Sequence, residues 1–283
     1  MIAFAKANLR KYDTSKVCRV LNVSRSGYYK AIRAEKREDS EIEKQVIHCF
    51  ERHNGNYGRI RIRKELSRHG VDVSEYRISG ILRRNGLTAK GGRTGKRRVQ
   101  KPTKEQYIEE NLIRDKFTVT EPNYLWCSDI TEVKVKGGKL YVCGVIDVAT
   151  RRIVGWAIDR RMTQEVVQRA IELAAIRNPK RPDGAIFHSD RGSQYTAKRT
   201  KEQVESLGFR KSMSRPGTPS DNQPIESFWH TLKRELGEMD KESYEEARAR
   251  IAAYIETYYN PIRLHSGIGY SAPSMFFSLL CVH

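Results

Sequence analysis

The sequence predicts an α/β protein, with an N-terminal helical (helix-turn-helix) region followed by a mixed five-stranded sheet flanked by helices. Two helix pairs, each interrupted by a short polar break, fall within residues 15–87. Beyond residue 120 the pattern changes to β segments interleaved with helices, in the order βββ-α-β-α-β-α-α. That order is typical of a mixed sheet with helices on its faces.

The 283 residues divide into four predicted parts. They are a helix-turn-helix segment at 1–36, a second helical domain at 37–88, a basic linker at 89–120, and an α/β domain at 121–283 that ends in a long helix. No stretch approaches the roughly 18 apolar residues needed to span a bilayer, so we expect a cytoplasmic protein.

Positive charge is concentrated in the N-terminal third. The formal net charge is +19, and residues 1–104 hold 27 Lys and Arg against 10 Asp and Glu. Such a concentration attracts phosphate backbones through counterion release, which predicts binding to a nucleic acid. A solvated basic surface is the alternative interpretation.

The cysteines predict neither a disulfide framework nor a zinc site. The five are odd in number and scattered, with no C-x-x-C pair. His48, Cys49 and His53 lie close together, but a zinc site requires a second ligand pair at regular spacing. We therefore interpret these three as ordinary helix residues.

The helical parts carry clear boundary signals. Ser24 is the expected N-cap of the second helix in SKVCRVLNVSRSGYYKAIR. In the next domain Gly70 closes one helix and Ser74 opens another, which Gly86 ends. That last helix pairs an apolar stripe with basic side chains, Ile78, Ile81 and Leu82 with Arg77, Arg83 and Arg84. Helix pairs also form plain bundles, but these arginines favour DNA binding.

The linker contains the segment KGGRTGKRRVQKPTK at 90–104, which is rich in Gly, Lys and Arg and has no apolar periodicity. It is predicted to be flexible. Its simplest role is that of a tether. Because it is positively charged, it would also follow a DNA backbone, with Arg97 and Arg98 as candidate contacts.

The α/β domain is predicted element by element. Strands are expected at 124–135, 140–148, 152–159, 184–190 and 209–214, and helices at 162–178, 196–208, 221–236 and 241–259. A loop, RPGTPS, precedes the helix at 221–236.

Asp129 lies on an apolar face of the first strand, because its odd-numbered neighbours are mostly apolar. A carboxylate there is costly unless a metal ion or a basic side chain compensates it. If Gly137-Gly138 form a two-residue turn, Asp129 lies opposite Ile146. Asp147 and Glu132 then point to the other face, so neither is expected to join Asp129.

Two further acids stand at positions that favour ligand binding. Asp190 ends a short buried strand, although an Asp that opens a turn is equally common. Glu226 lies in the first turns of a helix, where it also complements the helix dipole. Trp229, on the same helix, is predicted to be a core residue rather than a contact. Three convergent carboxylates suit Mg²⁺ or Mn²⁺, and a two-metal site would activate both the attacking and the leaving oxygen.

Several strings resemble the DDE transposases of the bacterial insertion sequence 3 family, in particular the B-frame product. They are WCSDIT, FHSDRGSQY and SDNQPIESFWHTLKREL, with 35 residues between Asp190 and Glu226, together with CRVLNVSRSGYY, NYGRIRIRKEL and YYNPIRLHSGIGYSAP. The core is also similar to that of retroviral integrases. The resemblance covers nearly the whole chain.

The resemblance implies a ribonuclease H-like integrase core at 121–283, with Asp129, Asp190 and Glu226 as catalytic ligands of two Mg²⁺ or Mn²⁺ ions. It implies a DNA transposase, in which water frees a 3′-OH at the element's end and that hydroxyl attacks another strand. The implied DNA contacts are Asn222, His230, Lys233, Arg263 and His265. The last two also fit a polar helix end.

The implied partners are double-stranded DNA, in the form of terminal inverted repeats and target DNA, and a homo-oligomer assembled on it. An A-frame protein is a further possible partner, and the implied location is the bacterial nucleoid. Two alternatives stay open: a DNA-binding regulator of the element with an inactive core, and a ribonuclease H-like nuclease that does not join strands. The intact triad argues against the first, and the basic N-terminal third against the second.

Overall fold

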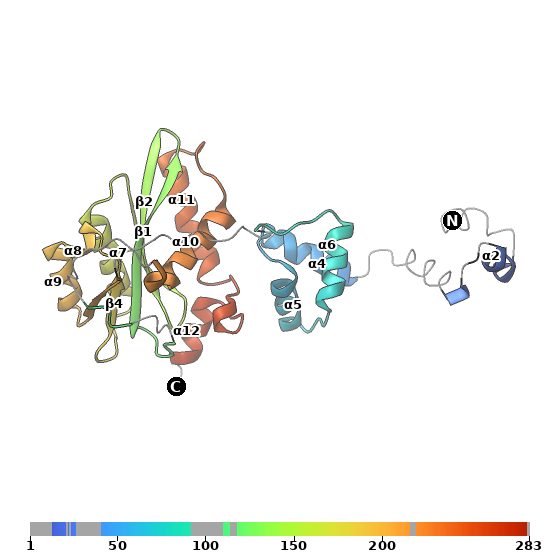
Figure 1. Cartoon of the computed structure of the whole chain (residues 1–283), viewed down its shortest axis with the longest axis horizontal. Coiled ribbons are helices and arrows are strands. Elements are labelled where there is room, and N and C mark those ends of the chain that lie inside the picture. The colour runs from blue at the N-terminus through green and yellow to red at the C-terminus, as the bar shows by residue number, and fades with distance from the viewer. Residues whose placement is uncertain are drawn as a thin grey trace. The chain divides into compact units, whose positions relative to one another are not determined.

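The structure is a computed structural model that describes residues 13–20, 22, 24–26, 41–91, 110–113, 118–215 and 219–281. It divides into two compact units, Met1–Ala89 and Lys90–His283, most of whose elements are labelled in Figure 1. None of the described helices is long and apolar enough to cross a membrane. Arg97, Arg98 and most of the second helix predicted within 15–33 lie outside the described residues.

The N-terminal unit is helical. Its described helices are α2 (Thr14–Val20), α4 (Glu41–Arg52), α5 (Arg59–Arg68) and α6 (Glu75–Arg84). The predicted boundaries of the last two are confirmed. Gly70 adopts a φ of +77°, which a helix-ending residue needs. The Ser74 side chain caps α6 by accepting a hydrogen bond from the Arg77 amide.

The apolar stripes of α4, α5 and α6 form the core of this unit. Ile62, Ile78 and Ile81 are fully or almost fully buried there. Cys49 lies within α4, and His53 stacks on Tyr57 just after it with ring centroids 3.7 Å apart. His48 and Cys49 are helix residues, as interpreted, whereas His53 lies in the turn just after the helix; Cys49 is a free thiol.

The second unit contains a five-stranded sheet in the order β3-β2-β1-β4-β5. The strands are β1 (Leu125–Val135), β2 (Gly138–Asp147), β3 (Ile153–Asp159), β4 (Ile186–Ser189) and β5 (Arg210–Met213). The first three strands pair antiparallel, and β4 and β5 run parallel to β1. The predicted mixed five-stranded sheet is confirmed.

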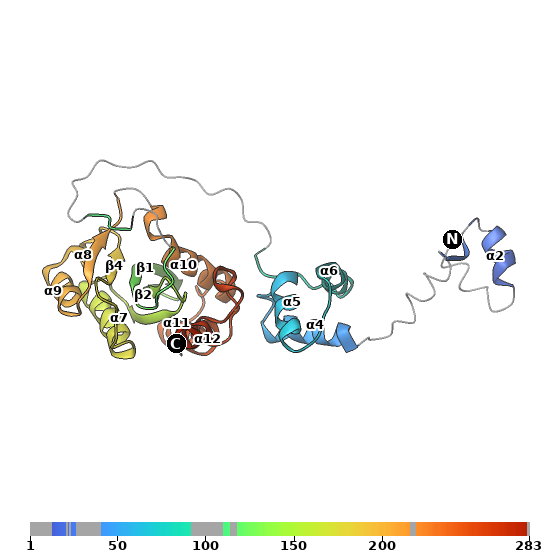
Figure 2. The ribbon, with the colours of Figure 1, turned by 90° about the horizontal axis from the view of Figure 1, so that it is seen from below.

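Helices cover both faces of this sheet (Figure 2). One face packs against α7 (Gln164–Arg177), with α8 (Ser193–Thr196) and α9 (Lys198–Ser206) nearby. The other packs against α10 (Gln223–Leu236) and α11 (Tyr244–Ala253), which continues as a π-helix at Tyr254–Tyr259. A helix that the sequence did not predict, α12 (Pro273–Cys281), follows near the C-terminus.

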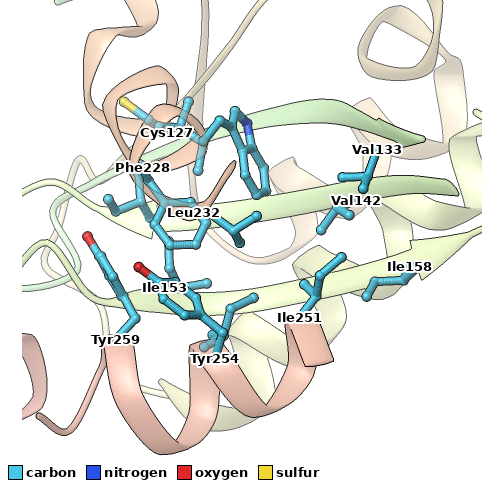
Figure 3. Packing of buried hydrophobic residues seen from close by; sticks show 14 of the residues in the cluster. Cys127, Val133, Val142, Ile153, Ile158, Phe228, Leu232, Ile251, Tyr254 and Tyr259 are labelled. Atoms are coloured by element: carbon cyan, nitrogen blue, oxygen red, sulfur yellow. The ribbon is translucent and has the colours of Figure 1, made fainter. Parts of the chain in front are cut away.

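The face under α10 and α11 contains a large apolar cluster (Figure 3). Phe228 and Leu232 of α10 meet Cys127 and Val142 of the two central strands there. Phe228 also packs edge-on against Tyr259, with ring centroids 4.7 Å apart. Because the cluster includes residues from α10 and from β1, burial of apolar surface fixes this helix against the strand that carries Asp129.

The hairpin between β1 and β2 corrects one prediction. The turn is Lys136-Gly137 rather than Gly137-Gly138, so Asp129 pairs with Gly144 and not with Ile146. Gly137 takes the left-handed φ of +79° that the turn requires, whereas Gly138 is already the first residue of β2. Moving the turn by one residue shifts the pairing by two, so each side chain keeps its predicted face.

Asp147 lies on the other face from Asp129, as predicted, since it pairs with Trp126. It is fully buried and accepts hydrogen bonds from the amide of Asn123 and from the amide and hydroxyl of Thr150. Asp147 therefore holds the turn after β2.

Candidate active site

Three elements of the second unit present the predicted carboxylates on the side of the sheet that α10 covers. Asp129 lies in β1, and Glu226 lies in the first turn of α10. Asp190 directly follows β4, which runs parallel to β1 with Ser128 paired to Ser189. Asp129 and Asp190 are the residues that follow this pair, so the two acids lie near each other, although 61 positions separate them in sequence.

Electrostatics couple the three carboxylates. The pKa of Asp129 is raised to about 7, first by burial and then by the negative charges of Asp190 and Glu226. Desolvation also raises the pKa of Asp190, against a hydrogen bond of 2.9 Å that its Oδ1 accepts from the Gly192 amide. Asp190 and Glu226 thus each lie close enough to Asp129 to disfavour its charge.

The donor set fits a divalent cation in its chemistry. Carboxylate oxygens are the ligands that Mg²⁺ and Mn²⁺ prefer, and a bound cation would relieve the repulsion at Asp129. Across the described residues, however, no three His, Cys, Asp or Glu side chains are grouped tightly enough to hold a metal ion. These carboxylates would have to move closer together to share one.

Trp229 is buried, as predicted, and it also contacts the site. Its side chain is 5% exposed, and its indole Nε1 donates a hydrogen bond of 3.0 Å to Oδ2 of Asp129. The ring lies against Gly144, the residue paired with Asp129, where an added Cβ would lie 2.8 Å from Cη2 of Trp229. Sequence reasoning missed the bond to Asp129 because it depends on how α10 lies over β1.

Ser128 connects the elements around the site. Its carbonyl accepts a hydrogen bond of 2.8 Å from Nδ2 of Asn222, at the start of α10. Its hydroxyl donates to the carbonyl of Gly144 at 2.9 Å and lies 2.8 Å from the hydroxyl of Tyr195. Tyr195 belongs to α8, which begins three residues after Asp190. The segments that carry the three carboxylates are thus all bonded to β1.

Asn222 was expected to contact DNA, but the structure gives it another role. It is 3% exposed, and its amide nitrogen is bound to the Ser128 carbonyl. A side chain that is buried in this way is not available to a phosphate. The structure therefore does not support a DNA contact for Asn222.

His230 and Lys233 are both exposed on α10, and they lie four and seven residues beyond Glu226. Desolvation lowers the pKa of Lys233, while the negative charge of Asp129 opposes that shift. Lys233 therefore lies within electrostatic reach of the carboxylates. Both side chains can meet an anionic ligand.

Arg263 and His265 have structural partners. Arg263 is 2% exposed, and its guanidinium donates to both carboxylate oxygens of Glu235 at 2.6–3.0 Å. The Nδ1 of His265 accepts a hydrogen bond of 3.1 Å from the Gly267 amide and caps a short turn. The expected DNA contact of Arg263 is not supported, because its charge is already neutralised inside the core.

The predicted arginines of the N-terminal unit differ in their surroundings. Arg83 is exposed, whereas Arg84 is bonded to Glu43 at 3.0 Å and Arg77 is half-buried. Tyr76, which the sequence did not single out, is 89% exposed seven residues before Arg83 on α6. Seven residues are about two helical turns, so these two side chains share a face.

Known protein families match the helical region and the sheet-containing region of the chain separately. Residues 119–219 and 207–273 match two integrase core domain families, and residues 36–98 match an HTH-like domain family. In structure, the chain is similar to the HTLV-2 integrase catalytic core domain in complex with magnesium. That similarity has 15% identity and a TM-score of 0.41, and it covers 55% of this chain and 94% of the other.

Several relatives with higher identity are transposases. The chain is 38% identical to the transposase for insertion sequence element IS904 of Lactococcus lactis, over 83% of this chain and 92% of the relative. It is 34% identical to transposase InsF for insertion sequence IS3A of Escherichia coli, over 96% of each. The chain belongs to the insertion sequence 3 family of transposases.

Proposed function

We propose that the chain is a DNA transposase, a polynucleotidyl transferase that cleaves the 3′ ends of an insertion sequence and transfers them to other DNA. Asp129, Asp190 and Glu226 are its catalytic carboxylates, and its cofactor is Mg²⁺ or Mn²⁺, two ions per site. The observation that carries this proposal is that three acids from three separate parts of the chain lie near one another: burial raises the pKa of Asp129 to about 7, and the charges of Asp190 and Glu226 add to that rise.

The carboxylates and the basic residues of α10 have different proposed roles. When bound, the two ions would activate the attacking oxygen and stabilise the leaving oxygen. Asp129 and Asp190 supply oxygen ligands from adjacent parallel strands, and Glu226 supplies another from α10. His230 and Lys233 extend from Glu226 along the same helix and would hold the phosphates next to the reacting one. No covalent bond between protein and DNA is required.

The proposed DNA partners are the terminal inverted repeats and the target. The HTH-like unit would bind the element ends through the exposed face of α6, with Arg83 and Tyr76 as contacts. At least two protomers are proposed to act together on DNA, since both ends must be held while they are cut. An A-frame protein is a further proposed partner, and the nucleoid is the proposed location.

A joining assay tests the proposal. The purified chain is given an uncleaved element end, a target duplex and Mg²⁺, and both the cleaved strand and the covalently joined product are measured. We expect joining by the unmodified chain and a loss of at least 100-fold with Asp190→Asn. Free cut ends without joined product would indicate a nuclease. Tight DNA binding without cleavage in either Mg²⁺ or Mn²⁺ would indicate a regulator.

A further inference from the structure

We infer that Trp229 is a positioning residue that sets the orientation of Asp129 through its indole N–H. This inference rests on the proposed function. The direct contact is the hydrogen bond of 3.0 Å from Nε1 to Oδ2 of Asp129. It fixes one carboxylate oxygen relative to the sheet, and thereby the direction that the other oxygen offers to a ligand.

The indole itself is held in place. Trp229 is 5% exposed and packs against Phe228 with ring centroids 4.9 Å apart. On the strand side it lies over Gly144, where even a methyl group would come within 2.8 Å of the ring. A donor confined from both sides orients its acceptor more strictly than a mobile surface side chain does.

The same hydrogen bond ties two carboxylate-bearing elements together. Trp229 and Glu226 are three residues apart on α10, so they lie about one turn from each other. Because Trp229 binds a side chain of β1, the turn that carries Glu226 is held beside Asp129. The bond from Asn222 to the Ser128 carbonyl secures the start of the same helix. Removal of the indole N–H would therefore loosen both the direction of Asp129 and its separation from Glu226.

The chain contains a matched control in Trp156. Its Nε1 donates a hydrogen bond of 2.6 Å to Oε1 of Glu256, and the side chain packs against the same apolar cluster. Glu256 is not one of the three proposed ligands. Trp156→Phe thus removes an equivalent indole-to-carboxylate bond from the same domain and leaves Asp129 untouched.

The experiment measures binding of Mn²⁺ to the full chain bound to a pre-cleaved DNA end, by isothermal titration calorimetry. Trp229→Phe is compared with the unmodified chain and with Trp156→Phe. A second variant carries benzothienylalanine in place of Trp229, which keeps the bicyclic shape and removes only the N–H donor. This variant keeps the test decisive if the smaller phenylalanine ring disturbs folding.

We expect the two Trp229 variants to raise the Kd for Mn²⁺ by about 10-fold or more, as is typical when a group that orients a metal ligand is removed. The Mg²⁺ concentration for half-maximal joining should rise in parallel, and Trp156→Phe should change neither value. Mn²⁺ affinity within twofold of the unmodified chain in the benzothienylalanine variant would overturn the inference. Equal weakening by Trp156→Phe would overturn it as well. Absence of joining by the unmodified chain would instead contradict the proposed function.

Discussion

Arg263 and Glu235 form an ion pair in the core of the second unit. Nη2 of Arg263 and Oε1 of Glu235 are 2.6 Å apart, and both side chains are at most 2% exposed. Burial alone would raise the pKa of Glu235, but the bonds from Arg263 and the Tyr254 hydroxyl hold it below the usual value. The pair fixes the segment after the π-helix to the end of α10.

Loss of one partner should therefore destabilise the fold. Arg263→Ala leaves the charge of Glu235 buried without its main partner, and we expect a loss of about 3–5 kcal/mol in the free energy of unfolding. Urea denaturation measures it. Arg263→Met combined with Glu235→Leu removes both charges and should recover most of the loss. A stable Arg263→Ala chain with weakened DNA binding would restore Arg263 as a DNA contact.

Gly144 should be intolerant of any side chain. In Gly144→Ala the new Cβ would lie 2.8 Å from Trp229, so the indole or the strand must shift. Overpacking of this kind costs about 1–3 kcal/mol. Gly138→Ala, in the same strand, is the control, because no atom lies within 4 Å of its added Cβ. Thermal or urea unfolding of the two variants should separate them, and equal stabilities would contradict the packing described.

His188 should make stability depend on pH. Burial lowers its pKa from 6.5 to about 4, and its ring nitrogens are bonded to the hydroxyls of Ser212 and Ser214. Between pH 6.5 and about 4, the unfolded state binds more protons at His188 than the folded state does. The free energy of unfolding therefore falls as the pH is lowered through this range. The contribution of His188 should fall by about 2 kcal/mol between pH 7.5 and 5.

Urea denaturation at these two pH values, with EDTA present, measures this loss. His188→Gln removes the titrating ring, so the loss of stability between pH 7.5 and 5 should be about 2 kcal/mol smaller in this variant. An unchanged pH dependence would mean that His188 is not held neutral in the folded chain.

Lys233 should act on DNA rather than on stability. It is exposed and lies near Asp129, where a phosphate of bound DNA would neutralise its charge. Lys233→Met should weaken binding of an element end and lower the slope of log K against log salt by about one. Fluorescence anisotropy at several salt concentrations measures the slope. Lys198→Met, at an 89% exposed position on α9, should leave it unchanged.

The strands and the face of Asp129 were predictable because strand periodicity is local. The residues of β1 alternate in the sequence, and the wrong turn position gave Asp129 the partner Ile146 instead of Gly144 without changing its face. The position of Asp190 near Asp129, just beyond the paired residues of β1 and β4, was not predictable from periodicity. It depends on which strands become neighbours, and that is a property of the whole sheet.

The two predicted DNA contacts that the structure does not support, Arg263 and Asn222, have one cause in common. Arg263 and Asn222 look like exposed polar residues in sequence, yet their partners Glu235 and Ser128 lie 28 and 94 positions away. Local sequence carries no signal for such partners. Trp229 was correctly predicted as core, but its bond to Asp129 depends on how α10 lies over β1.

The central claim is that Asp129, Asp190 and Glu226 together perform strand cleavage and joining. The most direct measurement compares cleaved strand and joined product from an uncleaved element end for Asp129→Asn, Asp190→Asn, Glu226→Gln and Glu132→Gln at equal DNA occupancy. Glu132 is the control, because it lies in β1 but on the opposite face, paired with Lys139 at 2.9 Å. We predict that the first three lose at least 100-fold while Glu132→Gln stays within about threefold of the unmodified chain. Joining that survives loss of any one of the three carboxylates would contradict the account.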